Sequence, residues 1–176
     1  MSRLNPCTGV FLKQPLPEFH VAVTQLQASS VTSRIWERDH TVWGRGQTGI
    51  VDRLGWLDIV DRMRDEIIEL QNFAKQIVEE RFTQIVVIGM GGSSLVSEVL
   101  WNTIGKSGDY PEIIVLDSTL SATVDLVIET IDVDNALFVV ASKSGDTIET
   151  STLFSCFMEL VHQRSRSRSI GEHFVA

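Results

Sequence analysis

A strand that runs directly into a glycine turn constrains the fold of this chain more than any other stretch. Residues 85–88 are four apolar, β-branched residues, and residues 89–94 read Gly-Met-Gly-Gly-Ser-Ser. Such a run is typical of a strand covered on both faces, and the glycines allow a tight turn that a ligand approaches closely. We expect a helix over residues 95–103, with Ser93 or Ser94 as its N-cap. Free amides at a helix N-terminus favour an anion, most often phosphate, although a plain strand-to-helix turn would need the same glycines for steric reasons.

The strand-and-helix pattern continues after the glycine turn. Two apolar runs of strand length alternate with two segments that carry apolar residues at helical spacing: residues 113–116, 124–131, 136–140 and 153–161. Residues 173–176 have the pattern of the start of a fourth strand. Alternating strands and helices predict right-handed βαβ units, so we predict an α/β fold with three layers, αβα, around a parallel sheet that is incomplete at its C-terminus. Ligands bind such sheets at the carboxyl ends of the strands, where the glycine turn lies.

The first 80 residues have a different, helical pattern. We predict that residues 1–80 form an extended arm and a helical lead-in, and that residues 81–176 form the αβα domain. The arm, over residues 1–17, contains three prolines. Helical segments are expected at residues 19–29, 31–39 and 51–80, with Gly55 breaking the last of them in two.

Apolar residues in this lead-in are expected to pack. One helix face carries an apolar stripe formed by Met63, Ile67, Leu70, Ala74 and Ile77. Trp36 and Trp43 are interpreted as packing anchors, because large aromatic side chains dominate core energetics.

Composition restricts the function classes. The net charge of −8 argues against binding to nucleic acid or to an anionic membrane. No apolar run approaches the roughly 18 residues of a membrane span, and the N-terminus has no signal-peptide pattern. Cys7 and Cys156 cannot form a disulfide framework, so we expect buried or indifferent thiols in a cytoplasmic protein. Residues 89–149 hold ten carboxylates and two lysines, so backbone amides would have to do most of the work of binding a phosphate.

A second turn repeats the chemistry of the first. Residues 142–150, after the third predicted strand, read Ser-Lys-Ser-Gly-Asp-Thr-Ile-Glu-Thr. They place two serines, a lysine and a glycine before another helix, for which Asp146 and Glu149 form a plausible capping pair at N-cap and N3. Two such turns at one edge of a sheet indicate a phosphate held between two helix N-termini.

Two other interpretations are weaker. Gly89 and Gly91 begin a dinucleotide-binding fingerprint and Asp117 ends the second strand, but the third fingerprint position is Ser94 rather than glycine or alanine. Residues 164–169 alternate arginine and serine, which is found in RNA-binding or phosphorylated segments. A solvated loop after a helix is the preferred reading, because the segment is short.

With both turns in view, the chain resembles the sugar isomerase (SIS) domain of the glucose-6-phosphate isomerase family. The specific matches are residues 89–94 and 142–150. Residues 34–39, 53–58 and 116–119 are most similar to the isomerase half of bacterial transaldolase–glucose-6-phosphate isomerase fusions. The resemblance implies a flavodoxin-like SIS sheet, of which this chain would hold the N-terminal portion.

The resemblance also implies a substrate and the residues that hold it. The family interconverts glucose 6-phosphate and fructose 6-phosphate, in glycolysis and gluconeogenesis, without a metal or cofactor, and its SIS turns hold the phosphate. Carried over position by position, the substrate-binding residues would be Gly92, Ser93, Ser142, Lys143, Ser144 and Thr147. The family usually has threonine where this chain has Asp146, whose carboxylate would repel phosphate unless it turned back to cap the helix.

The family's catalytic glutamate and its partners lie in later segments, so the resemblance implies no catalytic residue and no turnover by this chain alone. Four histidines match no catalytic position of the family: His20, His40, His162 and His173. We expect the phosphate-binding part of an isomerase for hexose 6-phosphate, acting as a homo-oligomer or with a missing C-terminal half. The alternative is a non-catalytic SIS module, like those of regulators, that binds a sugar phosphate without converting it.

Overall fold

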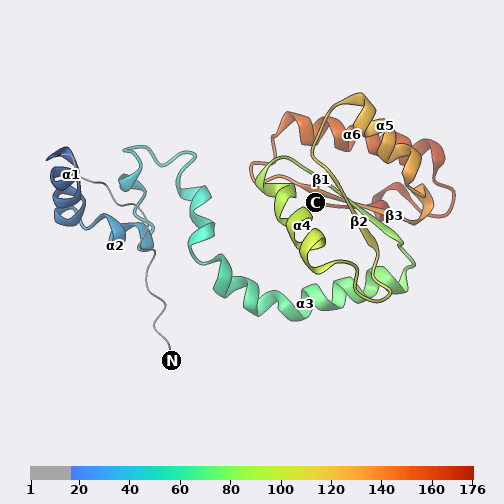
Figure 1. Ribbon diagram of the computed structural model, residues 1–176, viewed down its shortest axis with the longest axis horizontal. Helices are drawn as coiled ribbons and strands as arrows, with labels where there is room; N and C mark the ends of the chain where they lie inside the picture. Colours follow the sequence, from blue (N-terminus) through green and yellow to red (C-terminus); the bar gives the residue numbers. More distant parts are fainter. Residues whose placement is uncertain (1–16) are drawn as a thin grey trace. The chain divides into compact units, whose positions relative to one another are not determined.

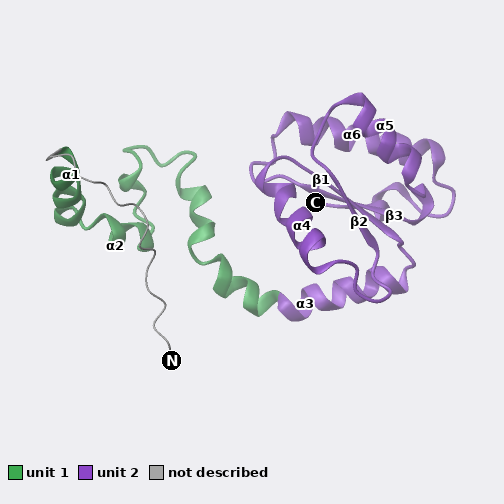
Figure 2. Ribbon diagram, viewed as in Figure 1, with its two compact units in different colours: residues 1–66 green, residues 67–176 purple. Residues whose placement is uncertain are grey.

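A computed structural model describes residues 17–176 of the chain. The predicted arm, except Pro17, and Cys7 lie outside the described residues. The chain divides into two compact units, residues 1–66 and 67–176 (Figure 2). The predicted domain boundary after residue 80 stays a prediction.

Short helices make up the first unit. α1 (Pro17–Ala28) and α2 (Val31–Trp36) are followed by two 3₁₀ helices, η1 (His40–Val42) and η2 (Val51–Leu57). The long helix α3 (Ile59–Glu79) begins in this unit. The prediction that Gly55 breaks the last helical segment is wrong. Gly55 lies inside η2, and the chain leaves that helix at Asp58, whose backbone is no longer helical.

Asp39 organises the turn between α2 and η1. Its carboxylate accepts hydrogen bonds from the Thr41 amide (2.9 Å) and hydroxyl (2.6 Å) and from Nε of Arg34 (2.7 Å). The Thr41 hydroxyl and the Arg34 guanidinium hold the pKa of Asp39 well below its usual value, because both interactions favour the charged carboxylate. The turn is therefore fixed by polar contacts rather than by a core.

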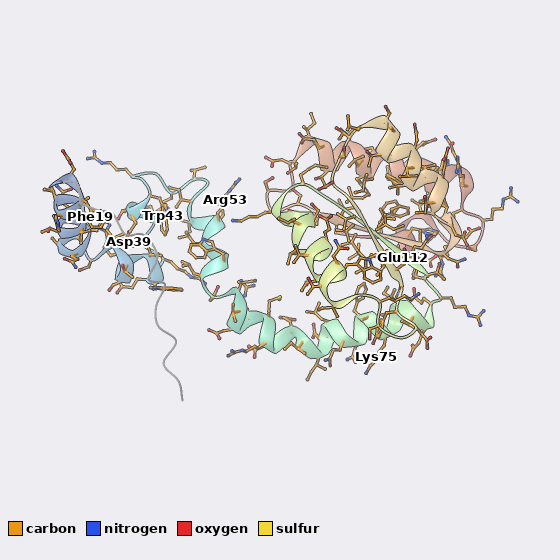
Figure 3. All side chains as sticks on the ribbon, in the orientation of Figure 1. Phe19, Asp39, Trp43, Arg53, Lys75 and Glu112 are labelled. Atoms are coloured by element: carbon orange, nitrogen blue, oxygen red, sulfur yellow. The ribbon has the colours of Figure 1, made fainter. Side chains whose placement is uncertain are left out.

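Trp36 and Trp43, two of the three tryptophans of this unit, do not anchor a core. Trp36 is 63% exposed and Trp43 is 45% exposed, so the interpretation as packing anchors is wrong for both. Figure 3 labels Trp43 among the side chains of this unit. Leu54 is buried in their place. A large apolar side chain stabilises a fold when it is buried, but the residue type alone does not show that the neighbouring residues bury it.

The second unit contains the parallel sheet that the sequence predicts. β1 (Gln84–Gly89), β2 (Glu112–Leu116), β3 (Ala136–Ala141) and β4 (Phe174–Val175) form one sheet in the order β2-β1-β3-β4. Each neighbouring pair is parallel. The four predicted strands are confirmed, including the short one at residues 173–176.

Helices cover both faces of the sheet, as the predicted αβα layers require. α4 (Gly92–Ile104) follows β1, α5 (Ser121–Thr130) follows β2 and α6 (Ile148–Arg164) follows β3. Figure 1 shows α3 and α4 on one side of the sheet and α5 and α6 on the other. Because α4 leads to one side of β1 and α5 leads back across it, the chain reverses its direction of winding between β1 and β3.

Alternate residues along the strands fill the two layers. Val86, Ile88 and Phe138 are fully buried in the main core, together with Phe157 of α6. A smaller cluster on the other face joins Ile77 of α3 to Phe82 and Leu137. The predicted apolar stripe of α3 is thus buried only toward its C-terminal end: Ile77 is 5% exposed, whereas Leu70 is 54% exposed.

The arginine- and serine-rich segment is a largely exposed loop after α6, as predicted, and specific contacts hold it in place. One carboxylate oxygen of Asp134 accepts hydrogen bonds from the Ser165 hydroxyl (3.1 Å), the Arg166 amide (2.8 Å) and the Ser167 hydroxyl (3.1 Å). The Arg168 guanidinium lies 4.2 Å from the centre of the Phe82 ring, a cation–π contact. Asp134 therefore ties this segment to the start of β3, a contact between residues more than 30 positions apart.

Candidate functional site

The two glycine- and serine-rich turns lie next to each other in the structure. They follow β1 and β3, which pair in parallel so that Gly89 is opposite Ala141 at the carboxyl ends. The winding of the chain reverses between these strands, and the carboxyl edge of a parallel sheet at such a reversal is where α/β folds bind ligands. The predicted meeting of the two turns at one edge is confirmed by this register.

The first turn depends on two glycines for different reasons. A Cβ atom on Gly89 would lie 3.1 Å from the carbonyl oxygen of Ala141 and 3.2 Å from Cβ of Ser93, so the turn closely approaches both β3 and the start of α4. Gly91 has φ 55° and ψ −122°, a region open in practice to glycine alone. Gly91, not Ser93 or Ser94, is the N-cap of α4, and no side chain caps this helix. The predicted serine cap is wrong, because the helix begins at Gly92, before either serine.

The serines of the first turn have separate environments. Ser94 is fully buried, and its hydroxyl donates to the carbonyl oxygen of Gly91 (3.1 Å). Ser93 is half-buried, and its amide donates to Met90 (3.2 Å). Gly91 and Gly92 make no hydrogen bond through their amides in the part of the chain that the structure describes. These two amides and the Ser93 side chain are therefore the donors that the first turn can offer to an anion.

The second turn is held together by its own hydroxyl groups. Oγ of Ser142 lies 3.1 Å from Oγ1 of Thr147 and accepts a hydrogen bond from the Gly145 amide (3.1 Å). Oγ of Ser144 lies 3.5 Å from Oγ1 of Thr147. Three of the predicted site residues therefore converge through their hydroxyls, while Lys143 extends from the same turn as an exposed cation.

The predicted capping pair of the second helix is wrong. Thr147 is the N-cap of α6, and no side-chain hydrogen bond caps it. Asp146 precedes the cap and is exposed, and Glu149, the second residue of the helix, is exposed as well. The capping role expected of Asp146, which would have turned its charge away from an anion, is not present. Asp146 lies in the turn and Glu149 in the first turn of α6, and Lys143 is the one cationic residue among residues 142–150.

A cavity of about 370 Å³ adjoins the second turn. Its walls come from β3, the second turn, α6 and the end of the chain: Val140, Ser142, Gly145, Thr150, Ser151, Phe154 and Ala176. Thr150 is 2% exposed, and its hydroxyl has no hydrogen-bond partner in the described part of the chain. Thr150 is not among the residues that the sequence predicts for the site, although its position in the first turn of α6, directly after the second turn, is a signal that could identify it.

A second cavity, of about 390 Å³, lies between α3 and α4. It is lined mostly by apolar side chains, including Phe73, Leu100 and Trp101, and it shares no residue with either turn. It offers no charged group to an anion. The chemistry of the lining, rather than cavity size, therefore selects the edge between β1 and β3 as the candidate site.

The described residues contain neither a group of metal ligands nor a membrane-spanning helix. Within residues 17–176, no group of three or more His, Cys, Asp or Glu side chains is placed to hold a metal ion. No helix in that range is long and apolar enough to cross a membrane.

His173 is buried at the amino ends of the strands, opposite the two turns, with Nδ1 2.9 Å from the carbonyl oxygen of Ala136. Cys156 is a free thiol exposed on α6, so of the two expected states, buried or indifferent, it does not have the buried one.

Comparison with known proteins agrees with this picture. Residues 40–176 match the model of the family described as phosphoglucose isomerase. Glucose-6-phosphate isomerases of Staphylococcus aureus strains NCTC 8325 and Newman are each 34% identical to the chain over 145 residues, which cover 78% of this chain and 31% of those proteins. The chain therefore spans about a third of the length of the curated relatives it matches.

Solved structures show the same fold. A glucose-6-phosphate isomerase from Chlamydia trachomatis superimposes with a TM-score of 0.60 and 26% identity, over 83% of this chain and 26% of that one. A hypothetical protein from Thermus thermophilus, at 22% identity and a TM-score of 0.58 over 90% of this chain and 35% of that one, shares the fold. The family match over most of the chain, together with the two turns, leads to one conclusion: the chain belongs to the phosphoglucose isomerase family.

Proposed function

We propose that this chain forms the phosphate-binding part of a glucose-6-phosphate isomerase. The observation that carries the proposal is the adjacency of two donor-rich turns at the ends of β1 and β3. The complete enzyme would convert glucose 6-phosphate to fructose 6-phosphate through an enediol. This reaction would belong to glycolysis and gluconeogenesis and take place in the cytoplasm. The similarity to fused isomerases stays a prediction.

Each turn supplies donors that suit a phosphate dianion. The first turn would contribute the amides of Gly91 and Gly92 and the hydroxyl of Ser93. The second would contribute the hydroxyls of Ser142, Ser144 and Thr147, which already lie within 3.5 Å of one another, and the Lys143 ammonium group. Hydrogen bonds to a charged acceptor are stronger than those between neutral groups, so this set favours phosphate over a neutral ligand.

The chain is proposed to bind hexose 6-phosphate without converting it. Isomerisation moves a proton between two carbons and needs a general base within hydrogen-bond reach of that proton. Neither turn contains a histidine, and the carboxylates of the second turn, Asp146 and Glu149, are exposed to solvent. A general base and the groups that open the sugar ring would come from elsewhere in the complete enzyme.

Binding and turnover are tested together on the 176-residue chain. Inorganic phosphate and glucose 6-phosphate at millimolar concentration are expected to raise the Tm, and glucose is not. The double variant Ser93→Ala, Ser144→Ala is expected to lose most of the shift. Ser155→Ala is the matched control, because Ser155 is exposed on α6 and donates to the carbonyl oxygen of Ser151, away from both turns.

Two results would contradict the proposal. If neither phosphate nor glucose 6-phosphate raises the Tm, the chain has no phosphate site of the proposed kind. Formation of fructose 6-phosphate by the chain alone would show that it carries its own general base. Binding without turnover by the complete natural protein would instead favour a non-catalytic, sugar-phosphate-sensing module.

A further inference from the structure

Thr150 carries a buried hydroxyl group that no other group satisfies. Thr150 is 2% exposed, and its Oγ1 has no hydrogen-bond partner among residues 17–176. Other hydroxyls of the same helix are satisfied by the helix itself: Thr152 donates to the carbonyl oxygen of Ile148 (2.7 Å), and Ser155 donates to that of Ser151 (2.9 Å). Thr150 lies in the first turn of α6, where that arrangement is not made. Since an unpaired buried hydroxyl costs free energy, the position needs an explanation.

The position of Thr150 beside a cavity explains why its hydroxyl is unpaired. Thr150 lines the cavity of about 370 Å³ that also borders Ser142 and Gly145, two residues of the second turn. The cavity therefore adjoins the place proposed for the phosphate. Its volume is within the range of small-molecule sites, which begins at about 300 Å³.

The lining of the cavity favours a neutral polyhydroxyl group over a second anion. Val140 and Phe154 provide apolar walls, and Thr150 and Ser151 provide neutral hydroxyls. An anion would lose its hydration here without gaining a positive charge among these residues. A sugar presents hydroxyls at its rim and C–H groups on its faces, so it suits walls of both kinds.

We propose that Thr150 is a ligand-binding residue that hydrogen-bonds a sugar hydroxyl of the bound sugar phosphate, whose phosphate lies on the second turn. This inference rests on the proposed function and extends the same site into the adjoining cavity. Threonine in a helix divides between two χ1 rotamers, so a change of rotamer is the movement by which the hydroxyl would reach the sugar. Thr150 then selects sugar phosphates over phosphate esters that lack the sugar.

The test compares two ligands in three proteins by titration calorimetry. Thr150→Val removes the hydroxyl and keeps the shape of the side chain, whereas Thr150→Ser keeps the hydroxyl. We expect Thr150→Val to weaken glucose 6-phosphate binding about tenfold, the effect of losing one hydrogen bond in a buried site, and to leave inorganic phosphate within about twofold. Thr150→Ser keeps most of the affinity for both. Thr152→Val is the matched control and changes neither, because Thr152 is exposed on the same helix.

Several outcomes separate this inference from the proposed function. If the unaltered chain binds neither ligand, the proposed function fails, and this inference fails with it. If the chain binds both but Thr150→Val weakens them equally, or weakens neither, Thr150 makes no contact with the sugar. A measurement without any variant covers the case of a poorly folded Thr150→Val: glucose 6-phosphate is expected to bind tighter than methyl phosphate, and equal affinities would overturn the inference.

Discussion

A Cβ atom on Gly89 would lie 3.1 Å from the carbonyl oxygen of Ala141. These two residues end β1 and β3, and they are opposite each other in the sheet. The same Cβ would lie 3.2 Å from Cβ of Ser93, on the first turn of α4. Gly89 is therefore a point of close approach between β1, β3 and the start of α4, and its lack of a side chain permits this spacing beside the candidate site.

Replacement of Gly89 by alanine should destabilise the protein. The added methyl group forces the Ala141 carbonyl or the start of α4 to move, and overpacking of this kind costs about 1–3 kcal/mol. The expected result is a lower midpoint of urea unfolding with an unchanged m-value. Gly171→Ala is the matched control, because a Cβ at that glycine meets nothing within 4 Å, and its backbone is not left-handed. Equal stability of both variants would show that the neighbours of Gly89 move to admit the methyl group without loss of stability.

Asp146 is predicted to weaken the binding of phosphate by this chain. Its carboxylate lies exposed at the second turn and does not cap α6, so its charge is free to repel an anion. Asp146→Thr should raise the affinity for inorganic phosphate about three- to tenfold at low salt, given about 1 kcal/mol between unit charges a few ångströms apart in water. The gain should shrink at ionic strengths near 0.15 M, where the screening length is about 8 Å.

The control for Asp146→Thr is Asp125→Thr, which makes the same change in net charge on an exposed position of α5. Titration calorimetry with phosphate at two salt concentrations measures both variants. Unchanged or weaker binding by Asp146→Thr would mean that Asp146 assists the ligand, for example by ordering the turn. A matching gain in Asp125→Thr would mean that net charge, not position, sets the affinity.

The sheet of the second unit was predictable because each strand carries its own signal. Residues 85–88, 113–116 and 136–140 are apolar runs of strand length, and they appear as β1, β2 and β3 with bounds that differ by at most one residue at either end. Such runs reflect burial on both faces, which parallel strands share. Parallel pairing of the first and third strands then brings both turns to one edge without any further information.

The helix caps and the distant contacts were not predictable in the same way. The N-cap of α4 is Gly91 and not the predicted Ser93 or Ser94, and the N-cap of α6 is Thr147 and not the predicted Asp146. A cap depends on backbone angles and not on the residue type alone. The role of Asp134 depends on a segment more than 30 residues away. Sequence patterning reports on neighbours along the chain, so contacts of this kind become visible only in the folded structure.

Asp134 should make stability depend on pH in the acid range. The Arg166 amide, followed by the hydroxyls of Ser165 and Ser167, holds the pKa of Asp134 below its usual value of 3.8 against the opposing effect of desolvation. A carboxyl whose pKa is lower in the folded state stabilises the protein above its unfolded pKa, and this contribution is lost as the pH falls through the folded pKa. We expect the Tm to fall as the pH decreases below about 4.

The variant Asp134→Asn should lower the Tm at neutral pH and flatten its decline in acid, because the amide does not titrate. Asp125→Asn is the control and should leave the Tm profile close to that of the unaltered chain. Thermal unfolding followed by circular dichroism from pH 3 to pH 7 measures all three proteins. A profile of Asp134→Asn that parallels the unaltered chain would show that other carboxyls cause the acid sensitivity.

His173 is predicted to stabilise the fold rather than to take part in chemistry. It is fully buried at the edge of the sheet opposite the two turns, with Nδ1 2.9 Å from the carbonyl oxygen of Ala136 and Nε2 3.0 Å from the Ser165 hydroxyl. The carbonyl oxygen can only accept, so Nδ1 carries a proton. His173→Ala removes these bonds and leaves a cavity beside Phe82, whose ring packs edge-on against the imidazole.

The expected loss for His173→Ala is about 2–4 kcal/mol, which combines a buried cavity with unpaired polar groups. His162→Ala, at an exposed position of α6, should stay within about 0.5 kcal/mol of the unaltered chain. Urea unfolding gives both values, and phosphate binding measured well below the unfolding midpoint should be the same in all three proteins. A His173→Ala variant that keeps its stability but loses phosphate binding would reverse the assignment, since it would connect the far edge of the sheet to the site.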